Sequence, residues 1–278
     1  MIAVSGSSGA AGSAGSGGAG SEAAALTVER RESVAVLTLN RPEKRNALDS
    51  ATLSRLRVVL AELGQDTELR AVLIRGAGNH FCSGADLAGL SAQFAVELEG
   101  VLGAIEAFPV PVVAAVQGAA LGAGLQLVLA CDLRVVAEDA RLGIPASRLG
   151  LLLNLENVIR LERAAGTVRA AEILYTGRPI SGVVAADWGM VNQAVPAGSL
   201  ETAAEELLER IASGAPRSVR GSKQALRALA ARARLDRSED ADVFARLDAL
   251  AGEALVSEDL QEGFRASMEK RAPRFTGR

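Results

Sequence analysis

One uncharged stretch, from Ala107 to Cys131, constrains the fold of this chain more than any other feature. It is long enough to cross a bilayer, for which a helix needs about 20 apolar residues. However, prolines begin the stretch and polar or flexible residues interrupt it: Pro109, Pro111, Gln117, Gly118, Gly122, Gly124 and Gln126. We therefore predict a buried strand, a tight turn and a buried helix here, with no membrane span.

The same alternation of strand and helix patterns runs through the first two hundred residues. Apolar β-type runs stand at Ser33–Leu39, Ala71–Ile74, Pro111–Val116 and Leu133–Val136. Between them, leucines recur at helical spacing after a plausible N-cap at Asp49 or Ser50, and a second helix is expected from about Gly122. This alternation predicts an α/β fold.

From Leu200 onward the pattern predicts helices only, at Glu201–Ile211, Arg217–Arg234, Asp240–Leu255 and Asp259–Lys270. The second of these is basic, which suits either a solvated helix face or contact with a membrane surface or an anionic partner. We expect three parts: a Gly/Ala/Ser tail over residues 1–25, an α/β core over 26–199 and a helical segment over 200–278.

Composition excludes several classes of function. The 278 residues are 49% hydrophobic and 23% charged, which is typical of a globular protein, and the net charge of −3 argues against nucleic-acid binding. The tail lacks the charged and apolar regions of a secretion signal, so we expect a cytoplasmic protein. Cys82 and Cys131 have no metal-ligand spacing and are expected to be reduced and buried. His80 is the sole histidine, which disfavours hydrolase triads, and we expect it to be structural.

Two segments have small residues at an expected junction between a strand and the helix that follows it: HFCSGADL (His80–Leu87) and GAALGAGLQ (Gly118–Gln126). Such junctions leave backbone N–H groups without partners, and a helix N-terminus adds a favourable dipole. Two of these N–H groups aimed at one point would form an oxyanion hole, which stabilises a developing negative charge.

Together with LNRPEKRNAL (Leu39–Leu48), PVVAAVQGAALGAGLQLVLACDLRV (Pro111–Val135) and TGRPIS followed by WGMVNQAVP (176–196), these segments resemble the enoyl-CoA hydratase/isomerase (crotonase) superfamily. The resemblance covers about Val28 to Arg274. It implies a crotonase (ClpP/crotonase-type) spiral of ββα units, a helical C-terminal trimerisation segment, and a trimer or a pair of stacked trimers. It also implies that the N–H groups of Ala85 and Ala123 hold the carbonyl of an acyl-CoA or enoyl-CoA thioester, with no cofactor beyond that ligand and no metal.

The departures from the family concern acid–base chemistry. Family hydratases carry one glutamate three residues after the second oxyanion position, where this chain has Gln126. They carry another after a proline, where this chain has Ala146. An amide can hydrogen-bond water but cannot take its proton, and a methyl group can do neither. The resemblance therefore implies weak hydration or none, as in the mycobacterial hydratase-like paralogues that lack both glutamates.

Two further positions are candidate replacements for the missing glutamates. Dienoyl isomerases of the family place an aspartate where this chain aligns Asn154, and Glu156 follows in the leucine-rich segment Leu151–Glu156. We read this segment as an apolar loop, bulkier at Leu153–Asn157 than the glycines of the family, that lines an acyl tunnel. A carboxylate in such a loop is a candidate acid–base group, although the favoured interpretation of Glu156 is a surface or intersubunit charge.

For the CoA moiety the resemblance implies contacts at the first loop, the first signature and the C-terminus: Lys44, Arg45, Ala47, Ser83, Asp86, Leu87 and Lys270. Three hypotheses follow. The first is an acyl-CoA binder in lipid metabolism with little hydration. The second is an active isomerase or lyase that uses Glu156 or a substrate group as its base. The third is a scaffold that has lost the ligand.

Overall fold

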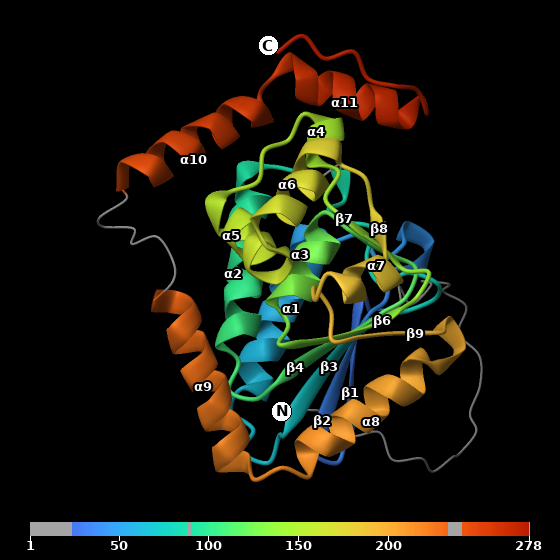
Figure 1. The fold of residues 1–278 in the computed structure, drawn as a ribbon, viewed down its shortest axis with the longest axis vertical. Helices are drawn as coiled ribbons and strands as arrows, with labels where there is room; N and C mark the ends of the chain where they lie inside the picture. Colours follow the sequence, from blue (N-terminus) through green and yellow to red (C-terminus); the bar gives the residue numbers. More distant parts are fainter. Residues whose placement is uncertain (1–23, 88–89, 233–240, 278) are drawn as a thin grey trace, which may run out of the picture.

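The computed structural model describes residues 24–87, 90–232 and 241–277. Its centre is a six-stranded sheet in the order β1-β2-β3-β4-β6-β9, in which every neighbouring pair is parallel except β1 and β2 (Figure 1). The strands are β1 (Leu26–Arg31), β2 (Val34–Leu39), β3 (Ala71–Gly76), β4 (Val112–Val116), β6 (Leu133–Ala137) and β9 (Gln193–Val195). The α/β expectation is confirmed.

Helices cover both faces of this sheet. On β4, Val112, Ala114 and Val116 join the larger core, while Val113 and Ala115 join a smaller one, because successive side chains of a strand point to opposite faces. The larger core lies under α1 (Ser50–Leu63), α2 (Ala92–Ala107) and α3 (Ala123–Ala130), and the smaller under α8 (Leu200–Ala212). The uncharged stretch thus holds a fully buried strand and a buried helix, as predicted, but the segment expected to be a tight turn also contains a short strand, residues 119–121. No helix among the described residues is long and apolar enough to span a membrane.

A second, three-stranded sheet stands in the order β5-β7-β8, formed by β5 (Ala119–Leu121), β7 (Arg141–Gly143) and β8 (Ile180–Ser181). Short helices and turns surround it: η1 (Pro42–Lys44), α4 (Ala146–Leu149), α5 (Leu155–Ala165), α6 (Thr167–Thr176), α7 (Gly182–Asp187) and η3 (Ala197–Ser199). Because β5 runs directly into α3, this small sheet sets the position of that helix.

The C-terminal part is helical, as expected, with α9 (Pro216–Arg232), α10 (Ala241–Leu255) and α11 (Glu258–Met268) after α8. The basic helix differs from a simple solvated face. Lys223 is buried on α9 and donates to Asp132 Oδ2 at 2.6 Å and to the carbonyl of Val110 at 3.0 Å, and Arg220 donates to the carbonyl of Leu69. Two of the basic side chains therefore attach α9 to the core. Arg234, and residues 1–23 of the expected tail, lie outside the described residues.

Two predictions about elements need correction. Residues 92–107, to which the sequence analysis assigned no element, form α2, whose N-cap is Ser91 accepting from Phe94 N–H. The segment read as an apolar loop up to Glu156 ends two residues earlier, at Asn154, whose side chain accepts a hydrogen bond from Asn157 N–H and caps α5. Glu156 therefore lies in the first turn of a helix. Asp49 is the N-cap of α1, as one of the two alternatives predicted.

Candidate active site

Three chain segments run parallel and in register at the small sheet. Ala120 on β5 pairs with Leu142 on β7 and, through an isolated parallel bridge, with Cys82 on its other side. The hydrogen bonds from Cys82 N–H to the Ala119 carbonyl, and from Leu121 N–H to the Cys82 carbonyl, fix this alignment. Parallel segments in register end at the same edge, so the chain continues from three neighbouring positions beyond the three partners.

The residues that follow these three partners are those implied by the family resemblance. Ala85 and Ala123 each lie three residues beyond the paired Cys82 and Ala120, and Ala146 lies four beyond Leu142. Ala123 is the first residue of α3 and Ala146 the first residue of α4. The family resemblance implies that Ala85 and Ala123 act together, and the strand register starts their segments from neighbouring positions.

Glycines permit the close approach of the two signature segments. Gly84 has φ +112°, and a Cβ there would lie 3.0 Å from the Leu121 carbonyl oxygen and 3.8 Å from the nitrogen of Ala123. A Cβ on Gly124 would lie 2.4 Å from the Cys82 carbonyl oxygen, a distance that side-chain carbons do not adopt. Both positions therefore require glycine, and the contact brings the turn before Ala85 against the start of α3.

The two candidate N–H groups have suitable surroundings. In the bridge between Leu48 and Ala85, the hydrogen bonds run from Leu48 N–H to the Gly84 carbonyl and from Asp86 N–H to the Leu48 carbonyl. The N–H of Ala85 itself is thus turned away from Leu48. Ala123 follows the N-cap Gly122, and an N–H in the first turn has no acceptor within its own helix. The positive end of the α3 dipole lies at the same point.

Gln126 lies one helical turn after Ala123, and its backbone N–H donates to the Gly122 carbonyl at 3.1 Å. Its side chain is buried, with 8% exposure, and within the described residues its Oε1 atom has no hydrogen-bond partner. Side chains on a helix lean toward its N-terminus, so this amide covers the turn that begins at Ala123. The sequence predicted the position of Gln126 but not its unsatisfied oxygen.

Asn154 and Glu156, the candidate replacements for the missing acids, lie at the start of α5. The Asn154 Oδ1 atom accepts from both the backbone N–H and the side-chain amide of Asn157, so it serves as a helix cap. Asn157 in turn accepts from Arg160, whose guanidinium is 3% exposed and pairs with Glu99 and Glu106 of α2. This buried network joins α5 to α2, and no sequence signal used above indicated it.

The segment before α5 was expected to line an acyl tunnel. Leu151 and Leu153 pack against the larger core, whereas Leu152 is 45% exposed. The tunnel itself stays a prediction.

The expected CoA contacts fall into two groups. Lys44, the last residue of η1, and Arg45, which follows it, are both exposed. Ser83 lies beside them, because its N–H donates to the Arg45 carbonyl and its hydroxyl donates to the Lys44 carbonyl. Ala47 is buried, Asp86 is half-buried, and Leu87 is 40% exposed. Lys270 follows α11, which packs on α4.

Two residues that organise this loop escaped the sequence analysis, although they stand inside the quoted run LNRPEKRNAL. Arg41 pairs with Asp49 at 2.8 Å and with Asp86 at 3.4 Å, and donates to the Ala47 carbonyl. Burial opposes ionisation of Asp49, but hydrogen bonds from Thr52 and the charge of Arg41 prevail and lower its pKa. Asn46 is buried with φ +56°, and its amide donates to the carbonyls of Ala77 and His80.

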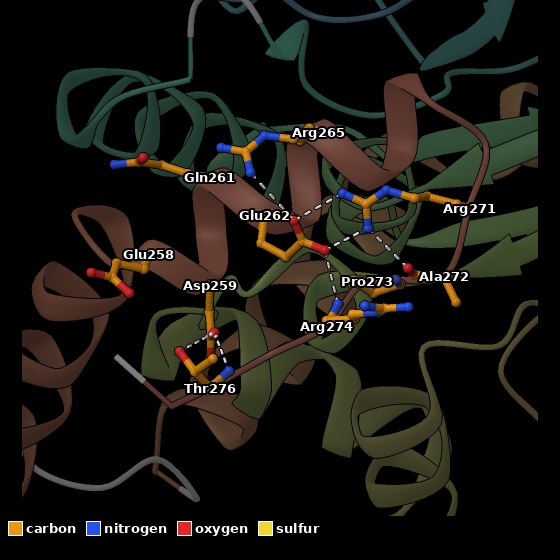
Figure 2. Close-up of a pocket in the computed structure, with 10 residues that line it drawn as sticks. All are labelled: Glu258, Asp259, Gln261, Glu262, Arg265, Arg271, Ala272, Pro273, Arg274 and Thr276. Carbon is orange, nitrogen blue, oxygen red and sulfur yellow. Dashed lines mark hydrogen bonds and ion pairs between the residues drawn. The ribbon is translucent and has the colours of Figure 1, made fainter.

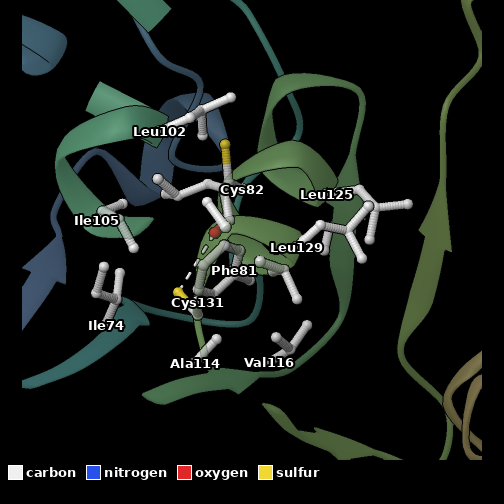
Figure 3. Packing of buried hydrophobic residues seen from close by; sticks show 14 of the residues in the cluster. Ile74, Phe81, Cys82, Leu102, Ile105, Ala114, Val116, Leu125, Leu129 and Cys131 are labelled. Carbon is white, nitrogen blue, oxygen red and sulfur yellow. Dashed lines mark hydrogen bonds between the residues drawn. The ribbon is translucent and has the colours of Figure 1, made fainter. Parts of the chain in front are cut away.

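Cys82, Cys131 and His80 have structural roles, as expected. Both cysteines are unbonded and lie within the larger core, beside residues such as Phe81 and Ile105 (Figure 3). Burial raises the pKa of each thiol to about 12, so neither provides a thiolate nucleophile near neutral pH. His80 accepts a hydrogen bond from Ala119 N–H at its Nδ1 atom, at 3.1 Å.

Two large clefts among the described residues lie away from Ala85 and Ala123. One of about 880 Å³ is formed by α11 and the tail that follows it, where Glu262 binds Arg271 through both carboxylate oxygens and Asp259 accepts from the N–H groups of Thr276 and Gly277 (Figure 2). Another, of about 900 Å³, lies between α9 and the end of α3. The lining of the first cleft holds the paired Glu262 and Arg271, and that of the second includes Leu129, Ile211 and Leu226 beside the Asp132–Lys223 pair.

Comparisons with known proteins agree with this geometry. Residues 29–278 match the family model for enoyl-CoA hydratase/isomerase. A probable enoyl-CoA hydratase of Bacillus subtilis is 36% identical over 262 residues, which cover 91% of this chain and 99% of that protein. An enoyl-CoA hydratase structure from Mycobacterium avium subsp. paratuberculosis has a TM-score of 0.80 and 29% identity, covering 91% of this chain and 99% of the other.

A structure of methylmalonyl-CoA decarboxylase complexed with 2S-carboxypropyl CoA has a TM-score of 0.83 and 27% identity, covering 92% of this chain and all of that one. The crotonase fold expected from the sequence resemblance is thus confirmed. The chain belongs to the enoyl-CoA hydratase/isomerase family.

Proposed function

We propose that this chain binds acyl-CoA thioesters of lipid metabolism and has little or no classical hydratase activity. The observation that supports the proposal is that the segments leading to Ala85, Ala123 and Ala146 run parallel and in register at the small sheet, with Gln126 one turn after Ala123. Two backbone donors are available there for a thioester oxygen. At the two positions where family hydratases have glutamates for proton transfer, this chain has an amide and a methyl group.

The backbone donors favour a thioester because its carbonyl oxygen becomes more negative when the neighbouring carbon reacts or enolises. Preorganised N–H groups in a buried setting bind such an oxygen without reorganisation, and removing one such donor from an enzyme typically costs about 3 kcal/mol of transition-state stabilisation. Ground-state binding gains less, about 1 kcal/mol for one net hydrogen bond. The site is therefore suited to holding an acyl-CoA even where no proton is moved.

Adding water across an enoyl double bond needs a group that deprotonates water and a group that protonates the α-carbon. General acid–base catalysis typically contributes a factor of about 10² to 10⁴. Gln126 can orient a water molecule but cannot accept its proton, and Ala146 can do neither. We therefore expect binding to be retained and hydration to be lost.

The proposal is tested by calorimetry with butyryl-CoA and free CoA on three proteins. Ala123→Pro removes the candidate N–H at the first position of α3, where proline is tolerated because that N–H has no helical acceptor. Thr167→Pro is the matched control, since Thr167 also begins a helix after a glycine N-cap, at α6. We expect butyryl-CoA to bind the wild type more tightly than CoA, and Ala123→Pro to weaken only butyryl-CoA, by about tenfold.

Equal affinity of the wild type for butyryl-CoA and CoA would contradict the proposal, and so would an unchanged butyryl-CoA affinity in a folded Ala123→Pro protein. Failure of every thioester to bind would favour the scaffold hypothesis instead.

A second candidate function has specific support from the similarity to methylmalonyl-CoA decarboxylase. Loss of CO₂ from a 2-carboxyacyl-CoA breaks a C–C bond, places its electron pair on the thioester as an enolate, and then needs one proton at the α-carbon. This lyase reaction requires no base to activate water, and two oxyanion donors stabilise its enolate. Release of CO₂ from methylmalonyl-CoA by the purified protein is the measurement that would establish it.

We also propose that the chain assembles as the family trimer or a pair of trimers. Leu226 and Leu229 on α9 are 68% and 64% exposed, and Leu250 on α10 is 45% exposed. Apolar helix faces of this kind are typical of surfaces that bury against other subunits. Light scattering at micromolar concentration should give a trimer or hexamer, and a stable monomer would contradict this assembly.

A further inference from the structure

The guanidinium group of Arg134, on β6, binds the C-terminal end of α3. The last carbonyls of a helix have no donor within it. The guanidinium donates to three of them, at 2.7 to 3.0 Å, on Val128, Leu129 and Cys131. Arg134 is half-buried, and burial lowers its pKa, but a guanidinium stays protonated near neutral pH. A cation therefore lies at the negative end of the α3 dipole.

The charge of Arg134 is not neutralised by direct contact with an acid. Arg160, by contrast, pairs with two carboxylates. In the described part of the chain no carboxylate is found paired with Arg134, whose guanidinium donates to carbonyls of α3 and of Met190. Asp132, two residues earlier, pairs with Lys223 at 2.6 Å. The C-terminal end of α3 thus has a positive charge that acts over distance.

The helix α3 connects this cation to the candidate thioester site. It begins at Ala123, whose N–H is one of the two candidate donors. Its eight residues span about 12 Å at about 1.5 Å per residue, and all eight are buried. Charges separated by buried structure are screened less than charges in solvent. At an effective dielectric constant of about 20, a unit charge about 12 to 15 Å away changes the ionisation of an oxygen by about three- to tenfold.

We propose that Arg134 is a positioning residue of the thioester site, and that its charge stabilises, through α3, a negative oxygen held at the Ala123 N–H. The inference rests on the proposed function, since it assumes that a thioester occupies the site. It adds a preference of the site for thioesters whose carbonyl oxygen carries negative charge. Both candidate functions are compatible with it, because a bound enolate has its charge at that oxygen in either case.

The probe for this test is acetoacetyl-CoA, which loses a proton from the carbon between its two carbonyl groups. The proton goes to solvent, and the ketone and thioester oxygens share the electron pair as an enolate that absorbs in the near ultraviolet. At a fixed pH, the absorbance of the bound ligand gives the ratio of enolate to neutral form. Arg134→Gln keeps a hydrogen-bond donor but removes the charge, so this ratio should fall about three- to tenfold. Arg134→Lys keeps the charge and should behave as the wild type does.

Two further variants separate the effect of charge from that of structure. Asp132→Asn removes a negative charge from the same end of α3, so the enolate ratio should rise. This variant decides the question if Arg134→Gln does not fold. Arg220→Gln is the matched control, because Arg220 on α9 also donates to backbone carbonyls, of Thr67 and Leu69, that lie outside α3. It should leave the ratio unchanged.

An unchanged enolate ratio in a folded Arg134→Gln protein, or in Asp132→Asn, would overturn the inference and leave the proposed function intact. A ratio in Arg134→Lys as low as in Arg134→Gln would also overturn it, because the hydrogen bonds and not the charge would then be responsible. An equal fall in Arg220→Gln would do the same, by showing that any lost arginine has this effect. Failure of the wild type to bind acetoacetyl-CoA would overturn the proposed function and this inference together.

Discussion

Two neighbouring helices differ in the hydrogen bonding of their buried polar side chains. On α5, the guanidinium of Arg160 is almost fully buried and donates hydrogen bonds to Glu99, Glu106 and Asn157. On α3, the amide of Gln126 is nearly as buried, and its oxygen has no partner in the described residues. The two helices pack against each other. The contrast indicates that the α5 network stabilises the fold, whereas under the proposed function the Gln126 amide lies at the thioester site.

The largest expected effect follows from removing the hydrogen-bonded network on α5. Arg160→Ala removes the cation between two partly buried carboxylates, so the free energy of unfolding should fall by about 3 kcal/mol or more. Urea denaturation measures this change. Arg210→Ala is the control, because its pair with Glu206 is exposed and should contribute less than about 1 kcal/mol. A loss at Arg160 no larger than at Arg210 would mean that the α5 network does not stabilise the fold.

A sharper form of the comparison exchanges one amide on each helix for an apolar residue. Asn157→Leu removes an acceptor that Arg160 uses, and should lower the free energy of unfolding by about 2 kcal/mol. Gln126→Met removes an oxygen that has no partner, so the unfolding free energy should stay unchanged or rise by about 1 kcal/mol. Equal destabilisation by the two substitutions, measured by urea denaturation, would show that the Gln126 amide has a structural partner after all.

The smallest expected effect concerns an exposed ion pair, between Glu262 and Arg271 at the C-terminal tail. The hydrogen bonds from Arg271 lower the pKa of Glu262 to about 2, from an ordinary value of 4.5. A lowered folded-state pKa contributes stability above the ordinary value, and this contribution is lost as the pH falls toward 2. In Arg271→Gln the pKa should return toward 4.5, so the tail should detach at higher pH.

Pepsin cleavage between pH 5 and pH 2 would report detachment of the tail, since the enzyme is active in this range. The variant should be cut after residue 268 at a higher pH than the wild type. Identical cleavage profiles would mean that this pair does not hold the tail.

The sequence was sufficient for β2, β3, β4 and β6, for α3 and for the helical C-terminus, because apolar periodicity is a local signal. The assignment of Ala85, Ala123, Gln126 and Ala146 to the family's site positions stays a prediction. The sequence could not predict the register that brings Cys82, Ala120 and Leu142 side by side, because strand pairing depends on segments that are distant in the chain. The sequence did not predict the start of α5, because the leucines around Asn154 indicated an apolar loop and not a helix N-cap at Asn154. The network at Arg160 depends on contacts with α2, which no local pattern reveals.

The central claim is that the thioester site is retained and only proton transfer is absent. Hydration of crotonyl-CoA, followed at matched protein concentrations, tests it most directly. The wild type should show negligible hydration, Gln126→Glu should add little, and Gln126→Glu combined with Ala146→Glu should give measurable hydration, because one carboxylate then positions water while the other protonates the α-carbon. Strong hydration by the wild type that Glu156→Gln abolishes would contradict the claim and identify Glu156 as the base. A folded double variant that binds acyl-CoA without hydrating it would equally contradict the proposed roles of these positions.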